Sequence, residues 1–142
     1  MTVDPFRQEM IDLLVRHEGM RLNVYADAAG KLTIGVGRNL TDVGISRAEA
    51  IVLLNNDLDA VIADLSTFPW FSSLDPVRQR ACADLRFNVG AGGLRTFVRF
   101  LADMAAGHYA AAAQELRSSR WDGQVGARAA ELAAMIETGS PA

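Results

Sequence analysis

Three residues in the first quarter of the chain have side chains that could cleave a glycosidic bond. Asp27 follows Glu18 by nine residues, and Thr33 follows Asp27 by six. Such cleavage needs one protonated carboxylic acid and one ionised carboxylate, whose surroundings must differ. Glu18 stands at the predicted end of a helix and beside an apolar stripe, which favours its protonated form. Asp27 stands at an exposed strand-to-turn junction, which favours ionisation, and the Thr33 hydroxyl could hold a water molecule beside it.

Each of these residues also has an ordinary structural explanation. A glutamate can simply lie on the surface, an aspartate can form an Asx-type turn, and a threonine is common in strands. The residue types alone therefore leave a catalytic and a structural interpretation open.

Other catalytic motifs are missing from the sequence. Gly35-Val36-Gly37 does not continue into a dinucleotide-binding fingerprint, and the chain has no G-x-S-x-G sequence. His17 and His108 belong to no H-E-x-x-H sequence and have no cysteine cluster nearby. We therefore expect no metal, no cofactor and no serine-based hydrolysis.

The composition predicts one domain with an apolar core. The chain has 142 residues, is 50% hydrophobic and carries a formal net charge of −3, which argues against nucleic acid as a partner. The single cysteine, Cys82, cannot form an intrachain disulfide and is predicted to be a buried small hydrophobic residue. The sequence shows no signal peptide and no membrane-spanning stretch, so we expect synthesis in a cytoplasm and release by another route.

The pattern of caps and apolar residues predicts an α+β protein that is mostly α. Asp4 and Pro5 open a first helix that Gly19 closes, and Ser46-Arg47-Ala48-Glu49 is a capping box that opens a long one. Trp70 and the residues 68–71 around it are predicted to lie in the core. The expected helices are 5–18, 46–65, 76–90, 94–106, 109–117 and 127–138, and the expected strands are 22–27 and 31–36.

The two strands are predicted to form a hairpin with the three-residue loop Ala28-Ala29-Gly30. If Gly30 is left-handed, Tyr25 pairs with Thr33, and Asp27 pairs with Lys31. One face would then carry Asn23, Tyr25, Asp27 and Thr33, and the other Leu22, Val24, Leu32, Ile34 and Val36. Gly35 and Gly37 would lie on the Thr33 side and leave bare backbone for a ligand.

The segment HEGMRLNVYADAAGKLTIGVGRNL resembles the active-site segment of the phage-type lysozymes, glycoside hydrolase family 24, the fold of tailed-phage endolysins. It matches the family pattern E-G-x-R-x-x-x-Y-x-D-x-x-G-x-x-T-I-G-x-G. The resemblance continues through LLNNDLDAV, SLDPVRQRACADLRFNVG, SSRWDGQVGARA and TGS, and so covers nearly the whole chain. It implies one lysozyme-like domain over 1–142, with a hairpin lobe at about 20–45, a connecting helix at about 46–65, and a helical lobe formed by about 66–142 together with helix 5–18. The active-site cleft would lie between the lobes.

The resemblance also implies roles for individual residues. Glu18 would be the general acid, Asp27 the carboxylate that assists the attacking water, and Thr33 the residue that holds this water. The substrate would be the β-1,4 bond between N-acetylmuramic acid and N-acetylglucosamine in bacterial peptidoglycan, cleaved with inversion by a monomer. Further residues implied at the site are Arg128 beside Glu18, Asn88 and Gln124 as hydrogen-bond donors to saccharide, Leu32 and Phe87 as cleft walls, and Trp121 either beneath the cleft or in the core.

The sequence departs from the family in two ways and leaves two other functions open. Arg38 stands where the family commonly has histidine, and we expect it to pair with Asp57. The chain is acidic (pI about 5.3), whereas many members are strongly basic. The other functions are a catalytically inactive wall-binding or virion protein of the same fold, and a lytic transglycosylase, which typically uses a single glutamate.

Overall fold

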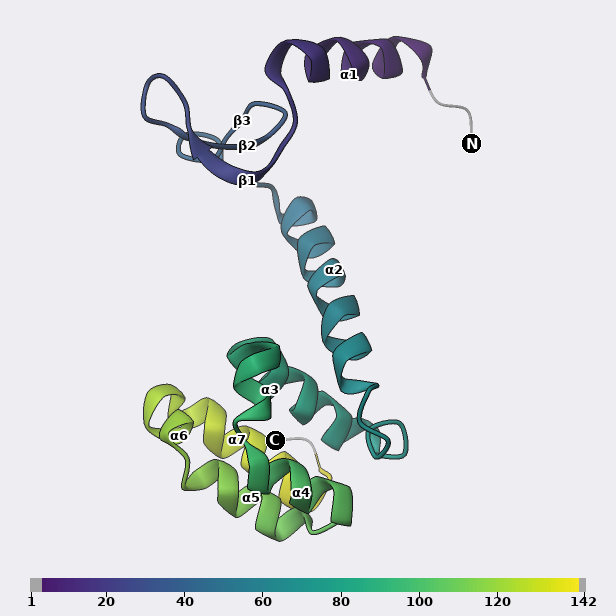
Figure 1. Ribbon diagram of the computed structural model, residues 1–142, viewed down its shortest axis with the longest axis vertical. Helices are drawn as coiled ribbons and strands as arrows, with labels where there is room; N and C mark the ends of the chain where they lie inside the picture. The colour runs from purple at the N-terminus through teal and green to yellow at the C-terminus, as the bar shows by residue number, and fades with distance from the viewer. Residues whose placement is uncertain (1–3, 141–142) are drawn as a thin grey trace. The chain divides into compact units, whose positions relative to one another are not determined.

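The computed structural model describes residues 4–140 and divides the chain into two compact units between Ile51 and Val52 (Figure 1). The first three and last two residues of the predicted domain lie outside the described residues. The first unit contains helix α1 (Pro5–Glu18) and a three-stranded antiparallel sheet in the order β1 (Arg21–Ala26), β2 (Leu32–Gly35), β3 (Arg38–Asn39). Seven helices with one small sheet confirm the predicted class, α+β and mostly α.

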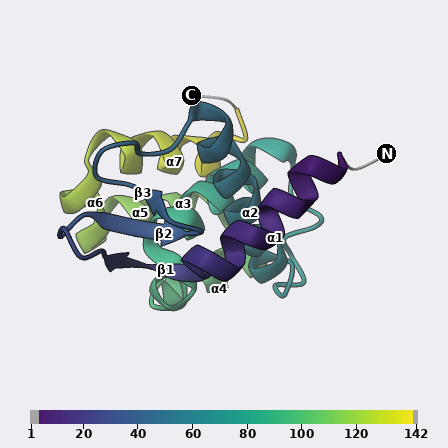
Figure 2. The same cartoon turned by 90° about the horizontal axis from the view of Figure 1, so that it is seen from above.

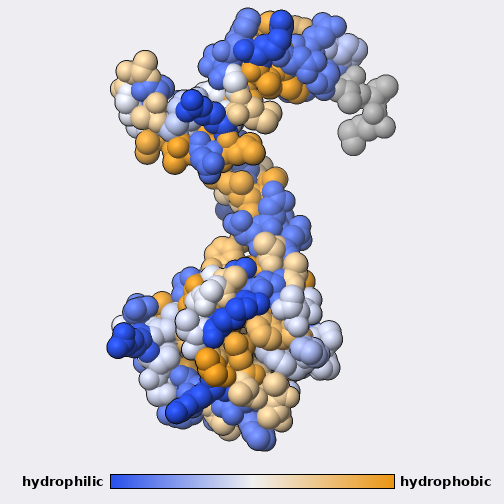
Figure 3. Space-filling model, in the orientation of Figure 1, coloured by the Kyte–Doolittle hydropathy of each residue, from blue (hydrophilic) through white to orange (hydrophobic). Residues whose placement is uncertain are grey.

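Helix α1 has the predicted ends. The Asp4 carboxylate accepts a hydrogen bond from the Phe6 backbone N–H, Pro5 is the first helical residue, and Gly19 follows the last one with φ +74°. Figure 3 shows hydrophobic residues gathered on the underside of this helix and hydrophilic residues over the rest of its visible face. None of its residues is buried.

The hairpin has the predicted turn, and the residues next to this turn pair in the predicted register. Tyr25 pairs with Thr33, the Asp27 backbone N–H donates to the Lys31 carbonyl, and Gly30 has φ +79°. A register shift between Arg21 and Tyr25 interrupts the pairing, so the regular alternation expected along this strand is wrong for that stretch. Strand β3, a two-residue strand paired with β2, was not predicted.

Helix α2 (Arg47–Leu65) begins with the predicted capping box. The Ser46 hydroxyl accepts from the Glu49 backbone N–H, and the Glu49 carboxylate accepts from the Ser46 backbone N–H. The helix begins in the first unit and continues into the second, where Val61 and Leu65 are buried.

The second unit is a helical assembly seen from two directions in Figures 1 and 2. Helices α5 and α7 pack together, and α7 also contacts α3 and α6. The short helix α6 was not predicted, and the expected helix 94–106 is interrupted, because α3 continues to Arg95 and α4 starts at Val98. The helices are α3 (Pro76–Arg95), α4 (Val98–Ala106), α5 (Tyr109–Arg117), α6 (Arg120–Val125) and α7 (Ala127–Thr138).

One buried cluster fills the second unit. Its largest fully buried side chains are Phe100, Leu65, Leu85, Leu94, Met104, Leu116 and Ile136. Phe71 is buried with Phe68 and Trp70 packed against the cluster, which confirms the predicted core role of this aromatic segment. Cys82 is buried, as expected, and burial raises the pKa of its thiol to about 12.

None of the helices between residues 4 and 140 combines the length and hydropathy that crossing a bilayer would require.

Helix α3 contains a break at Gly90 (φ +81°, ψ 172°), and one carboxylate binds both sides of it. The Asp64 side chain of α2 accepts hydrogen bonds from Arg86, before the break, and Arg95, after it. The hydrogen bond from Arg95, joined by that from Arg86, holds the pKa of Asp64 below its ordinary value, against the opposing effect of burial. The Asp64 side chain is 16% exposed, so water screens this pair of contacts only weakly.

Asp64→Asn should therefore destabilise the second unit by about 2 kcal/mol at pH 7, since it weakens two charge-assisted hydrogen bonds. A carboxylate with a depressed folded-state pKa stabilises above its unfolded value, near pH 4, and this stabilisation is lost as pH falls through the folded value. The difference in melting temperature from wild type should shrink below pH 4. Asp59→Asn, an exposed change on the same helix, is the control and should alter the melting temperature little. Equal melting temperatures for the two variants would contradict the role given to Asp64.

Candidate active site

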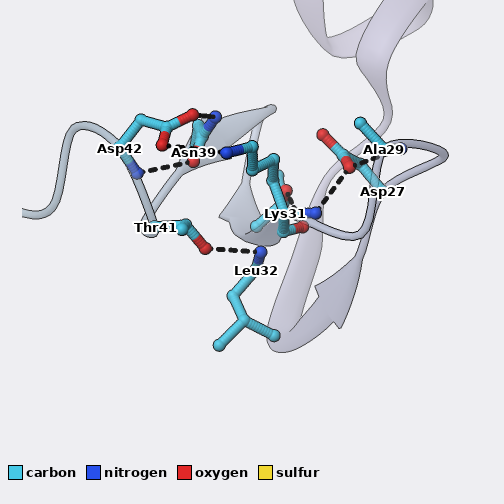
Figure 4. A network of polar contacts seen from close by, with 8 residues as sticks. Asp27, Ala29, Lys31, Leu32, Asn39, Thr41 and Asp42 are labelled. Atoms are coloured by element: carbon cyan, nitrogen blue, oxygen red, sulfur yellow. Dashed lines mark hydrogen bonds and ion pairs between the residues drawn. The ribbon is translucent and has the colours of Figure 1, made fainter.

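The Asp27 carboxylate is fixed by the turn that it closes. Its Oδ1 atom accepts hydrogen bonds from the backbone N–H groups of Ala29 (2.9 Å) and Lys31 (2.8 Å), as Figure 4 shows. Neither contact uses Oδ2. One carboxylate oxygen is therefore held by the backbone, and the other is available to a water molecule or substrate.

Thr33 is the one buried polar residue among those described, at 4% exposure. Its hydroxyl donates to the Lys31 carbonyl at 3.0 Å, and that carbonyl also accepts the Asp27 backbone N–H. Because the only hydroxyl hydrogen is committed, Thr33 can offer another group only its lone pairs. Lys31 therefore contacts two of the three predicted catalytic residues, Asp27 and Thr33, through its backbone. Its side-chain type gave no reason to expect this role.

The Glu18 side chain lies against the backbone of Gly37. A Cβ atom placed on Gly37 would come within 3.0 Å of Glu18 Oε2 and 3.4 Å of its Cδ, and Gly37 has φ +70°. The absence of a side chain at Gly37 thus makes room for Glu18, whereas the sequence pattern suggested that this space serves a ligand. The apolar surroundings predicted for Glu18 are not found in the first unit, because the side chain is exposed there.

The three predicted catalytic residues all belong to the first unit, two of them in the hairpin and one at the end of α1. The separation expected for an inverting pair, roughly 6.5–9.5 Å between the Glu18 and Asp27 carboxyls, stays a prediction.

Arg38 binds a different carboxylate from the one predicted. Its Nη1 atom donates to Glu49 Oε1 at 2.9 Å and to the Gly44 carbonyl at 3.1 Å, whereas we expected Asp57 as the partner. The contact with Gly44 brings the guanidinium to the start of α2, where Glu49 lies in the first turn. Asp57 lies eight residues further along this helix, about 12 Å away at 1.5 Å per residue.

The second unit holds the remaining predicted site residues. Asn88 Oδ1 accepts a hydrogen bond of 2.6 Å from the Trp121 indole, and Trp121 is buried in the core beside Phe97. An indole N–H is only a donor, so it engages the Asn88 amide oxygen and leaves the two donor hydrogens of the amide nitrogen for another partner. Gln124, on α6, is exposed.

Other predicted site residues line two pockets of the second unit. Phe87 and Asp57 line one of about 240 Å³, and Phe87 and Arg128 line another of about 300 Å³. The Arg128 guanidinium donates to Asp84 Oδ1 at 2.7 Å. Asp84 was missed in the sequence, although it lies on the same predicted helix as Phe87 and Asn88.

Within residues 4–140, no group of three or more His, Cys, Asp or Glu side chains is arranged to hold a metal ion.

The family model described as phage lysozyme matches residues 15–135. The chain belongs to the phage lysozyme family. Two relatives from Dictyostelium discoideum, probable T4-type lysozymes 1 and 2, are 26% and 28% identical to it, and each alignment covers 91% of this chain and 94% of the relative. The pre-baseplate central spike protein Gp5 of Enterobacteria phage T4 is 29% identical over 98% of this chain, which spans only 29% of the spike protein's length.

Family membership supports a lysozyme-type glycoside hydrolase with peptidoglycan as the substrate. The matched range contains Glu18, Asp27 and Thr33. The geometry of this family member adds two features that the sequence did not reveal: the backbone anchorage of Asp27 and Thr33 at Lys31, and the contact between Glu18 and Gly37.

Gly37→Ala should reduce lysozyme activity strongly, because the added methyl group would displace the Glu18 carboxyl. Gly44→Ala is a matched control, since Gly44 has nearly the same φ (+66°) but no atom within 4 Å of the position that a methyl group would take. Both variants carry a similar conformational penalty, on the order of 1 kcal/mol. Melting temperatures should fall alike, whereas turbidity loss of bacterial walls should fall far more for Gly37→Ala. Similar activities would show that the contact does not position Glu18.

Glu49→Gln should lower the melting temperature at pH 7 and pH 9 by similar amounts. The hydrogen bond from Arg38, with further bonds from Ser46, lowers the pKa of Glu49 to about 2. The unfolded value is about 4.3, so the stabilisation is present above this pH and lost as pH falls towards 2. The difference from wild type should therefore shrink between these values. A difference that persists at pH 2 would show that packing, not the charge pair, is responsible.

Proposed function

We propose that this protein hydrolyses the β-1,4 bond between N-acetylmuramic acid and N-acetylglucosamine in peptidoglycan with inversion of configuration. The observation that carries the proposal is the asymmetric anchorage of Asp27, with Oδ1 bound twice by backbone N–H groups and Oδ2 uncommitted. Such anchorage fixes the carboxylate and aims its second oxygen in one direction.

The two carboxyl groups would then divide the reaction. Glu18 donates its proton to the glycosidic oxygen of the leaving sugar while the bond from this oxygen to the anomeric carbon breaks. A water molecule attacks the anomeric carbon from the opposite face, and Asp27 Oδ2 accepts a proton from it. The products are a new reducing end and a free hydroxyl. Glu18 has lost one proton and Asp27 has gained one from water, so the number of protons on the two carboxyl groups is unchanged.

The hydroxyl of Thr33 defines how this water would be oriented. Because its hydrogen is donated to the Lys31 carbonyl, Thr33 would accept a hydrogen from the water, and Asp27 would accept the other. Both water hydrogens would be engaged, which leaves an oxygen lone pair to face the anomeric carbon. This arrangement supports general-base attack by water over attack by the substrate's own hydroxyl.

The residues of the second unit would bind the glycan. The amide nitrogen of Asn88 can donate to a carbonyl such as that of an N-acetyl group, and Gln124 offers a similar amide. Leu32 and Phe87, which are 52% and 44% exposed, can cover the apolar faces of sugar rings. Arg128, to which the resemblance also assigns a supporting role, would act with Asp84 bound to its guanidinium.

A second candidate, a virion component of the same fold, has one specific observation in its favour: the similarity to a phage spike protein over 98% of this chain. The two candidates differ in whether purified protein cleaves peptidoglycan.

Digestion of purified peptidoglycan tests the proposal. We expect muropeptides ending in reducing N-acetylmuramic acid, formed first as the α-anomer, as seen by mass spectrometry and early-time NMR. Glu18→Gln should abolish product formation to below a few per cent, since an amide cannot donate the proton, while its melting temperature stays equal or rises. Glu9→Gln, an exposed change on the same helix, should retain full activity. Anhydromuramic products would indicate a transglycosylase, a β-anomer would indicate retention, and no products from wild type would favour the virion component.

A further inference from the structure

The Lys31–Leu32 peptide unit is held at both of its ends. Its carbonyl oxygen accepts hydrogen bonds from the Thr33 hydroxyl (3.0 Å) and the Asp27 backbone N–H (2.9 Å). Its N–H group donates to the Thr41 hydroxyl at 2.9 Å. Because a peptide unit is planar, the bond at Thr41 fixes the direction of the carbonyl on the opposite side.

Residues 39–42, the end of β3 and the turn that follows it, which we term the 39–42 loop, provide this Thr41 contact and are themselves well anchored. Asn39 and Asp42 exchange hydrogen bonds, with the Asn39 amide donating to Asp42 Oδ2 and the Asp42 N–H donating to Asn39 Oδ1, both at 3.0 Å. The Leu40 N–H donates to the Leu32 carbonyl at 2.7 Å. The loop is thus joined to the hairpin by both backbone and side-chain contacts.

The Lys31 side chain adds a second contact to the same loop. Its ammonium donates to Asp42 Oδ1 at 3.2 Å, and both side chains are partly exposed. Figure 4 shows the loop residues on one side of Lys31 and Leu32, and Asp27 with its turn on the other. The backbone of Lys31 therefore lies between the loop and the two residues proposed to hold the attacking water.

We propose that Thr41, supported by the Lys31–Asp42 pair, is a positioning residue that sets the orientation of the Thr33 hydroxyl and hence of the water between Thr33 and Asp27. This inference rests on the proposed function. Without the Thr41 hydroxyl, the Leu32 N–H loses its partner and the peptide unit can rotate. The Thr33 hydrogen would then be free to point at the water, which would misorient the nucleophile without altering how the glycan binds.

The test compares Thr41→Val, which removes the hydroxyl at nearly constant shape, with Thr41→Ser, which keeps it. The substrate is a soluble, uncrosslinked peptidoglycan fragment, so that kcat and KM can be measured separately. We expect Thr41→Val to lower kcat by roughly tenfold with KM unchanged. A displacement of a reacting group by 1 Å lowers the rate about 100-fold, and we expect a smaller displacement of the water here. Thr41→Ser should restore kcat.

Thr138→Val is the matched control, because the Thr138 hydroxyl also accepts a backbone N–H, that of Ser140, but in the second unit. It should leave kcat unchanged. If Thr41→Val does not fold, Asp42→Asn decides, since it removes the charge that binds Lys31 and one of the two oxygens that accept hydrogen bonds from Lys31 and Asn39. We expect a loss of kcat of about twofold to fivefold from Asp42→Asn with KM unchanged, in keeping with an exposed pair.

Wild-type kcat in Thr41→Val, or in Asp42→Asn if that variant must decide, would overturn the inference. So would a change confined to KM, or equal loss of activity in Thr41→Val and Thr41→Ser. These outcomes leave the proposed function standing, because they require an active wild type. An inactive wild type would instead overturn the proposed function and the inference together.

Discussion

The peptide unit between Lys31 and Leu32 is the constraint on which the candidate active site depends. A carboxylate from the turn after β1 and a hydroxyl from β2 must be held in one arrangement, and side-chain rotamers alone would leave each of them several alternatives. Here the backbone removes that freedom, because Asp27 and Thr33 both bind to Lys31. The turn at Gly30 makes this possible, since its left-handed conformation returns the chain on itself within three residues.

Much of the fold could be predicted because local chemistry decides it. Asp4 with Pro5, and Ser46 with Glu49, predict helix starts through interactions within four residues, and the structure contains both caps. The hairpin register beside Gly30 was equally predictable. Break points were harder to predict, because the separation of α3 from α4 depends on how the helices pack.

The candidate site was predictable in its residue types but not in its contacts. A family pattern identifies Glu18, Asp27 and Thr33, whereas the partners that hold them are backbone groups, which any residue type could supply. The error over Arg38 has a related cause. The family pattern suggested Asp57, but the path of the chain through Gly44 brings Arg38 to Glu49, a residue whose capping role had already explained its presence. The Glu49 carboxylate accepts hydrogen bonds from both Ser46 and Arg38, whereas the sequence suggested only its bond with Ser46.

The buried thiol of Cys82 has a practical consequence for studying the molecule. Burial keeps it protonated at neutral pH, and only a thiolate reacts readily with alkylating reagents or disulfides. The folded second unit therefore shields the chain's sole sulfhydryl, which becomes reactive only when the helices around it separate. The rate at which a thiol reagent modifies the native protein would then record the frequency of those openings, without any introduced label.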